Sequence, residues 1–166
     1  MDIKIERAIG DLLRKKGQTL SVAESCTGGL VSDRITNVSG SSDYFEGGMV
    51  TYSIRAKAEY LAIPLKYIGR HGVVSAQVAK RMAQGVRKAF QTTYGLSTTG
   101  VAGPTGGAEK TPVGTVFIAI SSGKKTSGKK ISLKGSRRKI KEEAAEASLR
   151  FLYDRLIDDE SKQRKQ

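Results

Sequence analysis

Hydrophobic residues near the N-terminus recur at the spacing of one helix face. Positions three or four apart along the chain are apolar at Ile5, Ala8, Ile9, Leu12 and Leu13. This period is typical of an amphipathic helix. Lys15-Lys16-Gly17 then supplies a cationic last turn and a glycine stop. The pattern predicts a helix over residues 2–16.

A strand, a turn and a second helix are predicted next. Residues 19–23 are a short run of strand-forming residues, and Gly28-Gly29 opens an amphipathic stretch over residues 30–38. A buried strand is expected at residues 47–52 and a short helix at residues 55–61. Pro64 is expected to stop this helix. Each strand is therefore followed by a helix in this half of the chain.

The second half contains the clearest periodicity. Ser75 is a suitable cap for a helix whose inner face carries Val78, Ala79, Met82, Ala83, Val86, Ala89 and Phe90. Strands are then expected at residues 94–101, 114–122 and 126–133, with a glycine-rich loop at 103–113. Lys124-Lys125 is expected to turn the last two strands into an antiparallel hairpin.

A last helix is expected to begin at the cap Ser136, with inward positions at Ala145, Ser148, Leu149, Leu152 and Leu156. Residues 158–166 are expected to form a frayed C-terminal tail. Helices that alternate with strands, followed by a late β-hairpin, predict an α/β fold with three layers, α/β/α, around a mixed sheet. Because no repeat or linker is evident, we expect one domain over residues 1–157.

Composition fits this fold and excludes several classes of protein. The chain has 166 residues, 38% of them hydrophobic, enough to bury a core without disulfide or metal staples. Cys26 is the only cysteine and His71 the only histidine, which excludes an internal disulfide and a four-ligand Cys/His zinc site. The sequence contains no signal-peptide run and no membrane-spanning run. We therefore expect a cytoplasmic protein without membrane contact.

Positive charge is concentrated in one segment. The formal net charge is +13, and residues 124–141 contain nine basic and no acidic side chains. A solvated hairpin that runs into a helix start is one interpretation of this segment. A surface that faces phosphate or nucleic acid is the other. The segment has no aromatic residue, which disfavours binding of single strands by base stacking.

Three side chains that can act as nucleophiles lie together between the first strand and its helix: Ser25, Cys26 and Thr27. The backbone N–H groups of a helix start can stabilise an oxyanion there, and Gly28 and Gly29 allow a ligand close to the backbone. The alternative is that Ser or Thr only caps the helix and Cys26 only packs as a small apolar residue.

A serine nucleophile needs a base, and an ordinary Ser-His-acid triad would depend entirely on His71. Lys57 is the other candidate, because its neighbours Ala56, Ala58 and Leu61 are apolar and partial burial would lower its pKa. Tyr52 is placed to orient that lysine. The competing interpretations are a solvated surface lysine and a tyrosine that packs at a strand end.

Two further segments are expected at the same carboxyl edge of the sheet. Glu24 ends the first strand, where it would contact a substrate or accept N–H bonds of the turn. The glycine-rich loop from Gly100 to Gly107 follows another strand and should meet the first turn over one crevice. Its glycine order is that of neither a P-loop nor a dinucleotide-binding turn.

Five segments together carry a family resemblance: AESCTGG, GSSDYFEGGMVTYS, HGVVS, TGVAGPTGG and EKTPVGTVFIA. In this order and spacing they resemble the C-terminal domain of competence/damage-inducible protein A (CinA), the nicotinamide mononucleotide amidohydrolase family. The resemblance covers residues 5–155. It implies that the chain is a stand-alone domain that hydrolyses the carboxamide of a pyridine ribonucleotide without a metal or other cofactor.

The resemblance also implies site residues. Ser25 matches the family's serine nucleophile, Lys57 its lysine base, and Tyr52 belongs to the same motif. Substrate would be bound around Glu24, Cys26, Thr27, Gly28 and Gly29, with an oxyanion held by backbone N–H groups near Cys26 to Gly28. The loop containing Thr99, Gly100, Ala102 and Gly103 would shape the pocket, and Arg137 would bind the ribotide phosphate.

The chain departs from the family pattern at one place, where Ile54-Arg55 stands instead of the usual asparagine after the Tyr-Ser pair. This change removes a polar side chain near the lysine. The partner expected first is a small pyridine ribonucleotide, and exposed sheet edges are compatible with a homo-oligomer. The alternative function is a nucleotide- or nucleic-acid-binding module, with altered catalysis, that uses residues 124–141.

Overall fold

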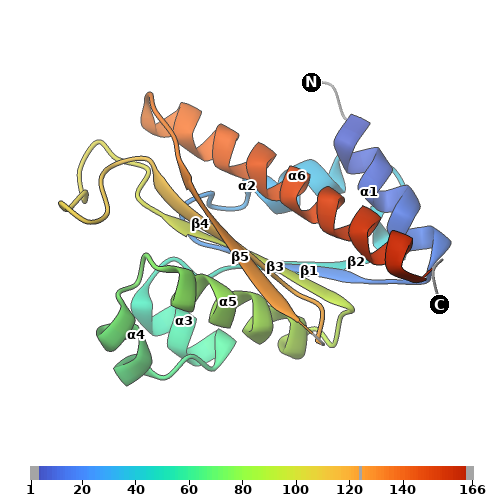
Figure 1. Cartoon of the computed structure of the whole chain (residues 1–166), viewed down its shortest axis with the longest axis horizontal. Coiled ribbons are helices and arrows are strands. Elements are labelled where there is room, and N and C mark those ends of the chain that lie inside the picture. The colour runs from blue at the N-terminus through green and yellow to red at the C-terminus, as the bar shows by residue number, and fades with distance from the viewer. Residues whose placement is uncertain (1–3, 124, 164–166) are drawn as a thin grey trace.

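The computed structural model describes residues 4–123 and 125–163. Its elements in chain order are α1 (Lys4–Lys15), β1 (Leu20–Glu24), α2 (Leu30–Thr36), the 3-10 turn η1 (Ser41–Asp43), β2 (Phe45–Val50), α3 (Ile54–Leu61), α4 (Leu65–His71), α5 (Ala76–Ala89), β3 (Tyr94–Gly100), β4 (Thr115–Ser121), β5 (Thr126–Ser132) and α6 (Arg137–Gln163). Figure 1 shows them as two layers of helices on either side of a twisted sheet.

The sheet is mixed, as predicted. Its strand order is β2-β1-β3-β4-β5. Strands β2 and β3 both run parallel to β1, whereas β4 is antiparallel to β3 and β5 is antiparallel to β4. The late hairpin is therefore confirmed as β4 and β5, although Lys124 in its turn lies outside the described residues. The carboxyl ends of the three parallel strands lie at one edge of the sheet.

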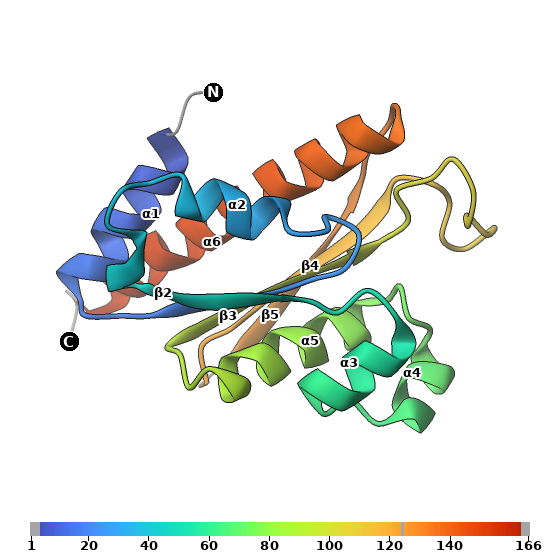
Figure 2. The same ribbon diagram turned by 180° about the vertical axis from the view of Figure 1, so that it is seen from behind.

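Helices cover both faces of the sheet, which confirms the three-layer fold. Helices α1, α2 and α6 lie on one face and α3, α4 and α5 on the other (Figures 1 and 2). Both faces of the sheet carry apolar side chains that must be shielded from water. In strand β4, for example, successive residues point to opposite faces and pack in different cores. Val116, Ile118 and Ile120 pack in the larger core, while Ala119 packs with Ala79 and Ala83 of α5.

Two glycines bring the second layer close to the sheet. A Cβ at Gly95 of β3 would lie 2.2 Å from Ala83 O, so α5 approaches β3 more closely than any side chain at that position allows. A Cβ at Gly85 of α5 would lie 2.4 Å from Leu61 O at the end of α3. These contacts fix α3 through α5 onto the sheet. The helix that carries Lys57 is thereby held at a defined depth.

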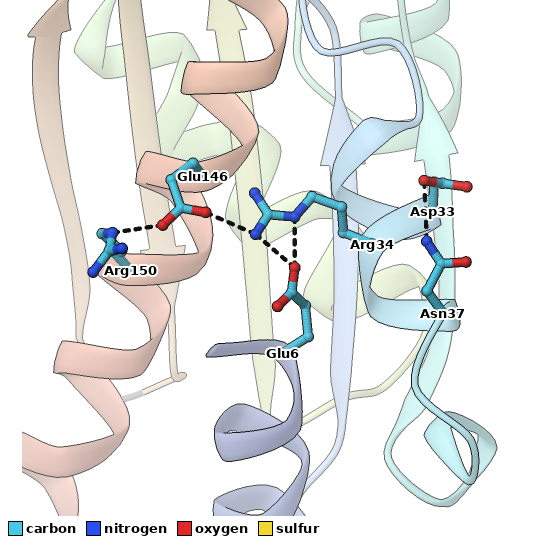
Figure 3. A network of polar contacts seen from close by, with 6 residues as sticks. All are labelled: Glu6, Asp33, Arg34, Asn37, Glu146 and Arg150. Atoms are coloured by element: carbon cyan, nitrogen blue, oxygen red, sulfur yellow. Dashed lines mark hydrogen bonds and ion pairs between the residues drawn. The ribbon is translucent and has the colours of Figure 1, made fainter. Parts of the chain in front are cut away.

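Three elements of the first layer are joined by an ionic network (Figure 3). Arg34 of α2 donates to Glu6 of α1 at 2.6 Å and to Glu146 of α6 at 2.7 Å. Arg150 forms an ion pair with the other oxygen of Glu146 at 2.6 Å. The network links elements that are far apart in the sequence.

The predicted inner face of α5 is confirmed for Val78, Ala79, Met82, Ala83 and Val86, whereas Ala89 is exposed and Phe90 is only half-buried. The predicted inward positions of the last helix are all buried: Ala145, Ser148, Leu149, Leu152 and Leu156. The cap at Ser75 is also confirmed, because its Oγ accepts the N–H of Val78 at 3.2 Å. No helix within residues 4–123 and 125–163 is long and apolar enough to cross a membrane.

Three further features differ from the sequence predictions. The strand expected to be buried at residues 47–52 is the edge strand β2, and none of its residues is buried. Helix α4 was not predicted, because its seven residues bury only Ile68 and show no amphipathic period. The prediction of a frayed tail is wrong for residues 158–163, which continue α6. Asp159 accepts hydrogen bonds from Tyr94 and Arg155, and Glu160 pairs with Lys15, so these turns are tied to β3 and α1. Residues 164–166 of the predicted tail lie outside the described residues.

Candidate active site

The site begins where β1 ends between two parallel neighbours. The N–H of Ser25 donates to Thr98 O of β3 at 3.0 Å, and the N–H of Thr51 donates to Glu24 O at 2.9 Å. These bonds hold the start of the turn against the ends of β3 and β2. As predicted for an open α/β sheet, the site lies at the carboxyl edge of its parallel strands.

Lys57 reaches this turn from α3. Ser53 caps α3, and its Oγ accepts the N–H of Ala56 at 3.0 Å. The Lys57 side chain is 0% exposed, and its Nζ lies 3.0 Å from Ser25 Oγ. The same Nζ donates to the carbonyls of Thr51 at 2.7 Å and Tyr52 at 3.2 Å. The structure therefore brings the predicted pair, Ser25 and Lys57, into direct hydrogen-bond contact.

The surroundings of Lys57 favour its neutral form. Burial lowers the pKa of Lys57 from its ordinary value of 10.5 to about 8. All three hydrogen-bond partners of the amine are uncharged. A neutral amine can donate its two hydrogens to the two carbonyls and accept the Ser25 proton in its lone pair. This geometry is that of a general base beside its nucleophile.

Glu24 has a structural role, which corrects the prediction that it binds substrate. Its side chain is 0% exposed. The carboxylate accepts five hydrogen bonds from the turn and the first residues of α2: Thr27 Oγ1, Gly29 N, Val31 N, Ser32 N and Ser32 Oγ. It thereby satisfies the free N–H groups at the helix start and offers no oxygen to a ligand.

Thr27 and Cys26 contribute no side-chain chemistry. Thr27 is fully buried, and its hydroxyl hydrogen-bonds to Glu24 and to Thr98 Oγ1 at 2.8 Å. Burial raises the pKa of the Cys26 thiol to about 11, so the thiol stays protonated and is a poor nucleophile at neutral pH. Ser25 is therefore the nucleophile candidate of the three.

The backbone donors of the turn are fewer than predicted. The N–H of Gly28 donates to Ser25 O at 3.1 Å, and the N–H of Gly29 donates to Glu24. Both glycines are therefore unavailable as donors to a substrate. Among the described residues, the N–H groups of Cys26 and Thr27 donate to no acceptor of another residue. Gly28 and Gly29 instead supply the turn's backbone shape, with φ of +63° and +101°.

A pocket of about 190 Å³ opens beside Ser25. It is lined by Ser25, Cys26, Tyr52, Val73, Val74, Thr99, Gly100, Ala102 and Arg137. The predicted loop residues Thr99, Gly100 and Ala102 therefore do reach the site. The Thr99 hydroxyl, however, donates to Val73 O at 3.0 Å and holds the loop before α5 in place. Gly103 takes part through its carbonyl, which accepts from Arg137.

Tyr52 and Arg137 form the rim of the pocket. Arg137 donates to Gly103 O at 2.8 Å and to the Tyr52 hydroxyl at 2.9 Å. The Tyr52 side chain is 59% exposed and points to Arg137, so the prediction that it orients Lys57 is wrong for the phenol. Its backbone carbonyl does hold the lysine. The two rim residues come from β2–α3 and from the start of α6.

Sequence reasoning missed Val73 and Val74, which supply an apolar wall of the pocket. They lie in the HGVVS segment, which was noticed only as a motif. His71 lies at the end of α4, with its ring centroid 4.4 Å from that of Tyr67, and does not line the pocket. In the part of the chain that the structure describes, no group of three or more His, Cys, Asp or Glu could hold a metal ion.

The fold and site together define a three-layer α/β protein with a buried Ser-Lys pair at the carboxyl edge of its parallel strands. The CinA C-terminal domain family model matches residues 2–156. The chain therefore belongs to this family, which confirms the resemblance.

Known proteins agree with this assignment. A "CinA-like protein" of Syntrophus aciditrophicus is 49% identical over 152 residues, 91% of this chain and 36% of that protein. A "putative competence-damage inducible protein" of Desulforudis audaxviator is 44% identical over 147 residues, covering 89% of this chain and 36% of that protein. The chain thus spans about a third of the length of these curated relatives.

Solved structures of similar proteins have the same fold. The competence/damage inducible protein CihA of Agrobacterium tumefaciens matches with a TM-score of 0.88 and 31% identity, over 90% of this chain and 92% of that chain. A CinA superfamily protein of Enterobacter cloacae matches with a TM-score of 0.89 and 30% identity, over 93% and 91%.

Proposed function

We propose that this domain is an amidohydrolase that converts nicotinamide mononucleotide to nicotinate mononucleotide and ammonia. The observation that carries the proposal is the 3.0 Å contact between the buried Lys57 Nζ and Ser25 Oγ. The depressed pKa of Lys57, the adjoining pocket and membership of the CinA C-terminal domain family support it.

The first half of the reaction forms an acyl-enzyme. Neutral Lys57 takes the proton of Ser25, whose Oγ attacks the carboxamide carbon. The oxyanion that develops accepts hydrogen bonds from the backbone N–H groups of Cys26 and Thr27, which donate to no acceptor of another residue within the described residues. Protonated Lys57 then gives its proton to the departing nitrogen. The C–N bond breaks and ammonia leaves.

The second half returns the enzyme to its starting state. Lys57, neutral again, removes a proton from water, and the resulting hydroxide attacks the ester carbonyl of the acyl-enzyme. The bond between the acyl carbon and Ser25 Oγ breaks, and the serine regains the proton from Lys57. The net change is one amide and one water consumed, with one carboxylic acid and one ammonia released, which become carboxylate and ammonium in neutral solution.

The pocket suits a flat ring with a charged tail. Val73, Val74 and Ala102 offer apolar surface for a pyridine ring beside Ser25. Arg137 at the rim uses only two of its five N–H donors on Gly103 and Tyr52, so it retains donors for a phosphate. The ring would therefore enter with its carboxamide at Ser25 and its ribose phosphate toward the rim.

The test is ammonia release from nicotinamide mononucleotide by the purified protein. Ser25→Ala and Lys57→Met should abolish release, whereas Ser42→Ala and Lys66→Met, which remove an exposed serine and an exposed lysine, should retain it. If the wild-type protein releases no ammonia, or if Ser25→Ala releases it at the wild-type rate, the proposal is wrong.

A second candidate function, sequence-independent binding of duplex nucleic acid, rests on the distribution of charge. Residues 60–141 contain 16 basic side chains and a single acidic one, Glu109. Twelve of the basic residues fall in the chain from α4 to the loop after β5, and the other four, at the start of α6, belong to the opposite helical layer. Lys80 of α5 lies beside Gly128 of β5, and Lys130 lies over the Phe117 ring, so the two elements form one basic surface.

Salt-dependent binding to duplex DNA tests this second candidate. Lys129→Ser with Lys130→Ser should reduce the slope of log affinity against log salt by about two. The matched control, Arg7→Ser with Lys16→Ser, removes the same charge from α1 and its end on the opposite layer and should leave the slope unchanged. Absence of binding by the wild-type protein at low salt would exclude the candidate.

A further inference from the structure

A second cation lies against the nucleophile turn and is used by no contact described so far. Lys141 is in the second turn of α6 and is half-buried. Its Nζ lies 3.3 Å from the position that a Cβ on Gly28 would occupy. Gly28 is three residues beyond Ser25, in the same turn. The ammonium therefore lies over the backbone of the turn that carries the nucleophile.

Lys141 differs from its neighbours on α6 in having no carboxylate partner. Arg138 pairs with Glu142 at 2.8 Å and Lys139 pairs with Glu143 at 3.8 Å, each one turn ahead. The residue one turn ahead of Lys141 is Ala145, and one turn behind is Arg137. Lys141 forms no ion pair within residues 4–123 and 125–163, so its charge is available to a ligand.

Arg137 is the neighbour of Lys141 on the same helix face. Residues four apart on a helix have Cβ atoms about 6 Å apart on one side. The partners of Arg137, a carbonyl and a phenol hydroxyl, are uncharged, so its positive charge is also uncompensated. Arg137 lines the pocket at its Tyr52–Gly103 rim, and Lys141 lies outside that lining, over the Gly28 turn that follows Ser25. Two adjacent unpaired cations of this kind fit a doubly charged anion.

We propose that Lys141 completes an anion subsite with Arg137, and that this subsite binds the phosphate of the nucleotide substrate. Lys141 is then the residue that makes the enzyme prefer a nucleotide to the nucleoside that lacks the phosphate. The inference rests on the proposed function for the identity of the substrate, although anion binding at this place does not depend on amide hydrolysis.

Gly28 explains why the ammonium is close enough to act. A side chain at position 28 would meet Lys141 Nζ and Cε, at 3.3 and 3.7 Å from its Cβ, and would push the lysine away from the turn. With glycine, the ammonium remains beside the turn that holds Ser25. A phosphate bound there is therefore tied to the same rigid segment as the nucleophile, which fixes the distance between phosphate and carboxamide.

The first experiment measures binding of ribose 5-phosphate and of ribose to the whole chain by calorimetry. Wild-type protein should bind the phosphorylated sugar, and Lys141→Gln should weaken that binding about tenfold, the loss typical of one charged hydrogen bond. Lys141→Arg should retain most of it. The matched control Lys139→Gln removes the same charge two residues away, from a lysine paired with Glu143, and should change affinity less than twofold.

The second experiment measures ammonia release from nicotinamide mononucleotide and from nicotinamide riboside. Lys141→Gln should raise the KM for the mononucleotide about tenfold while kcat stays within twofold. For the riboside, which has no phosphate, the same variant should leave kcat and KM unchanged. Equal losses for both substrates would overturn the proposal. So would a wild-type protein that binds ribose 5-phosphate no better than ribose.

The two experiments separate this inference from the proposed function. Lys141-dependent binding of ribose 5-phosphate without ammonia release would leave the subsite standing and refute the amidase. Ammonia release with unchanged discrimination in Lys141→Gln would support the amidase and refute the subsite.

Discussion

Two cations with little exposure lie on opposite sides of the sheet and have opposite kinds of hydrogen-bond partner. Arg34, whose side chain is 12% exposed, contacts two carboxylates, Glu6 and Glu146, in the layer of α1, α2 and α6 (Figure 3). Lys57, 0% exposed in the other layer, contacts one hydroxyl and two carbonyls. The first cation is neutralised by its partners, whereas the second is not.

The difference explains what each site can do. The carboxylates around Arg34 tie α2 to α1 and α6, so Arg34 contributes to the assembly of that layer. Neutral acceptors around Lys57 cannot offset its burial, so its pKa falls to about 8 and the amine becomes a base near neutral pH. A buried cation with carboxylates is therefore structural here, and one without them is reactive.

The largest expected effect comes from removing the uncompensated cation. Lys57→Met should lower kcat for ammonia release by about 10³-fold or more, because Ser25 then lacks its base. The circular dichroism spectrum should stay that of the wild type, since a buried apolar side chain replaces a buried charge. Activity within tenfold of the wild type would contradict the role assigned to Lys57.

The pH dependence of the wild-type enzyme sharpens the comparison. Only neutral Lys57 can accept the serine proton, so kcat/KM should rise about tenfold per pH unit at low pH and level off above about 8. Steady-state rates between pH 6 and 10 would measure this profile. A value of kcat/KM that still rises tenfold per unit up to pH 10, as expected for the ordinary lysine pKa of 10.5, would mean that burial does not tune the base.

Stability should respond to the same group. Between pH 8 and 10.5 the unfolded chain holds a proton on Lys57 that the folded chain lacks, so the free energy of unfolding rises with pH across this window. Urea unfolding of wild type and Lys57→Met at pH 7, 8.5 and 10 tests this. The wild type should gain stability relative to the variant as pH increases, and a difference independent of pH would argue against the lowered pKa.

Removing Arg34, whose charge is compensated by carboxylates, should lower stability and leave catalysis unchanged. Arg34→Met leaves the carboxylate of Glu6, which is 1% exposed, without its partner, so we expect a loss of about 3 kcal/mol in unfolding free energy. At temperatures where the Arg34→Met variant remains folded, it should keep the wild-type kcat for ammonia release. Arg150→Met, at the exposed end of the network, is the control and should cost well under about 1 kcal/mol.

The smallest effect is expected at Tyr52. The Tyr52 carbonyl holds Lys57, whereas the hydroxyl holds Arg137. Tyr52→Phe should therefore leave kcat unchanged and raise the KM for nicotinamide mononucleotide by about two- to threefold, the share of one exposed hydrogen bond. A large fall in kcat would show that the phenol takes part in proton transfer.

Sequence patterns predicted most of the fold because burial imposes them. The helix after Ser75 and the inward face of the last helix both follow from the requirement that apolar residues face the sheet. Helix α4 was not predicted because it buries a single residue, Ile68, and its sequence has no amphipathic pattern. It is held in place by packing on α3 and α5. The turns at residues 158–163 are fixed by Lys15 and Tyr94, which are distant in sequence.

The candidate site was predicted in part for an equally physical reason. Ser25 and Lys57 carry distinctive side chains and follow adjacent strands, so topology brings them together. The sequence could not predict that the Thr51 and Tyr52 carbonyls hold the lysine. Every residue has a backbone carbonyl, and only the fold determines which carbonyls point toward the amine. The sequence allowed two roles for Glu24, contact with substrate or acceptance of N–H bonds from the turn. Only the structure decides for the second role, because it shows five hydrogen bonds from the turn and α2 to the carboxylate.

The departure at Ile54-Arg55 also has a clear position. Ile54 is the first residue of α3 and its side chain is 48% exposed. The Lys57 amine is held by Ser25 and by two backbone carbonyls, so its three hydrogen bonds are complete with isoleucine at position 54.

The central claim is that Lys57 titrates near neutral pH because its partners carry no charge. Its ionisation can be followed directly by NMR of protein with ¹³C-labelled lysine side chains, with Lys57→Met identifying the Lys57 signal. The account predicts a titration midpoint of about 8 for this one signal. A midpoint at or above the ordinary lysine value of 10.5 would contradict it.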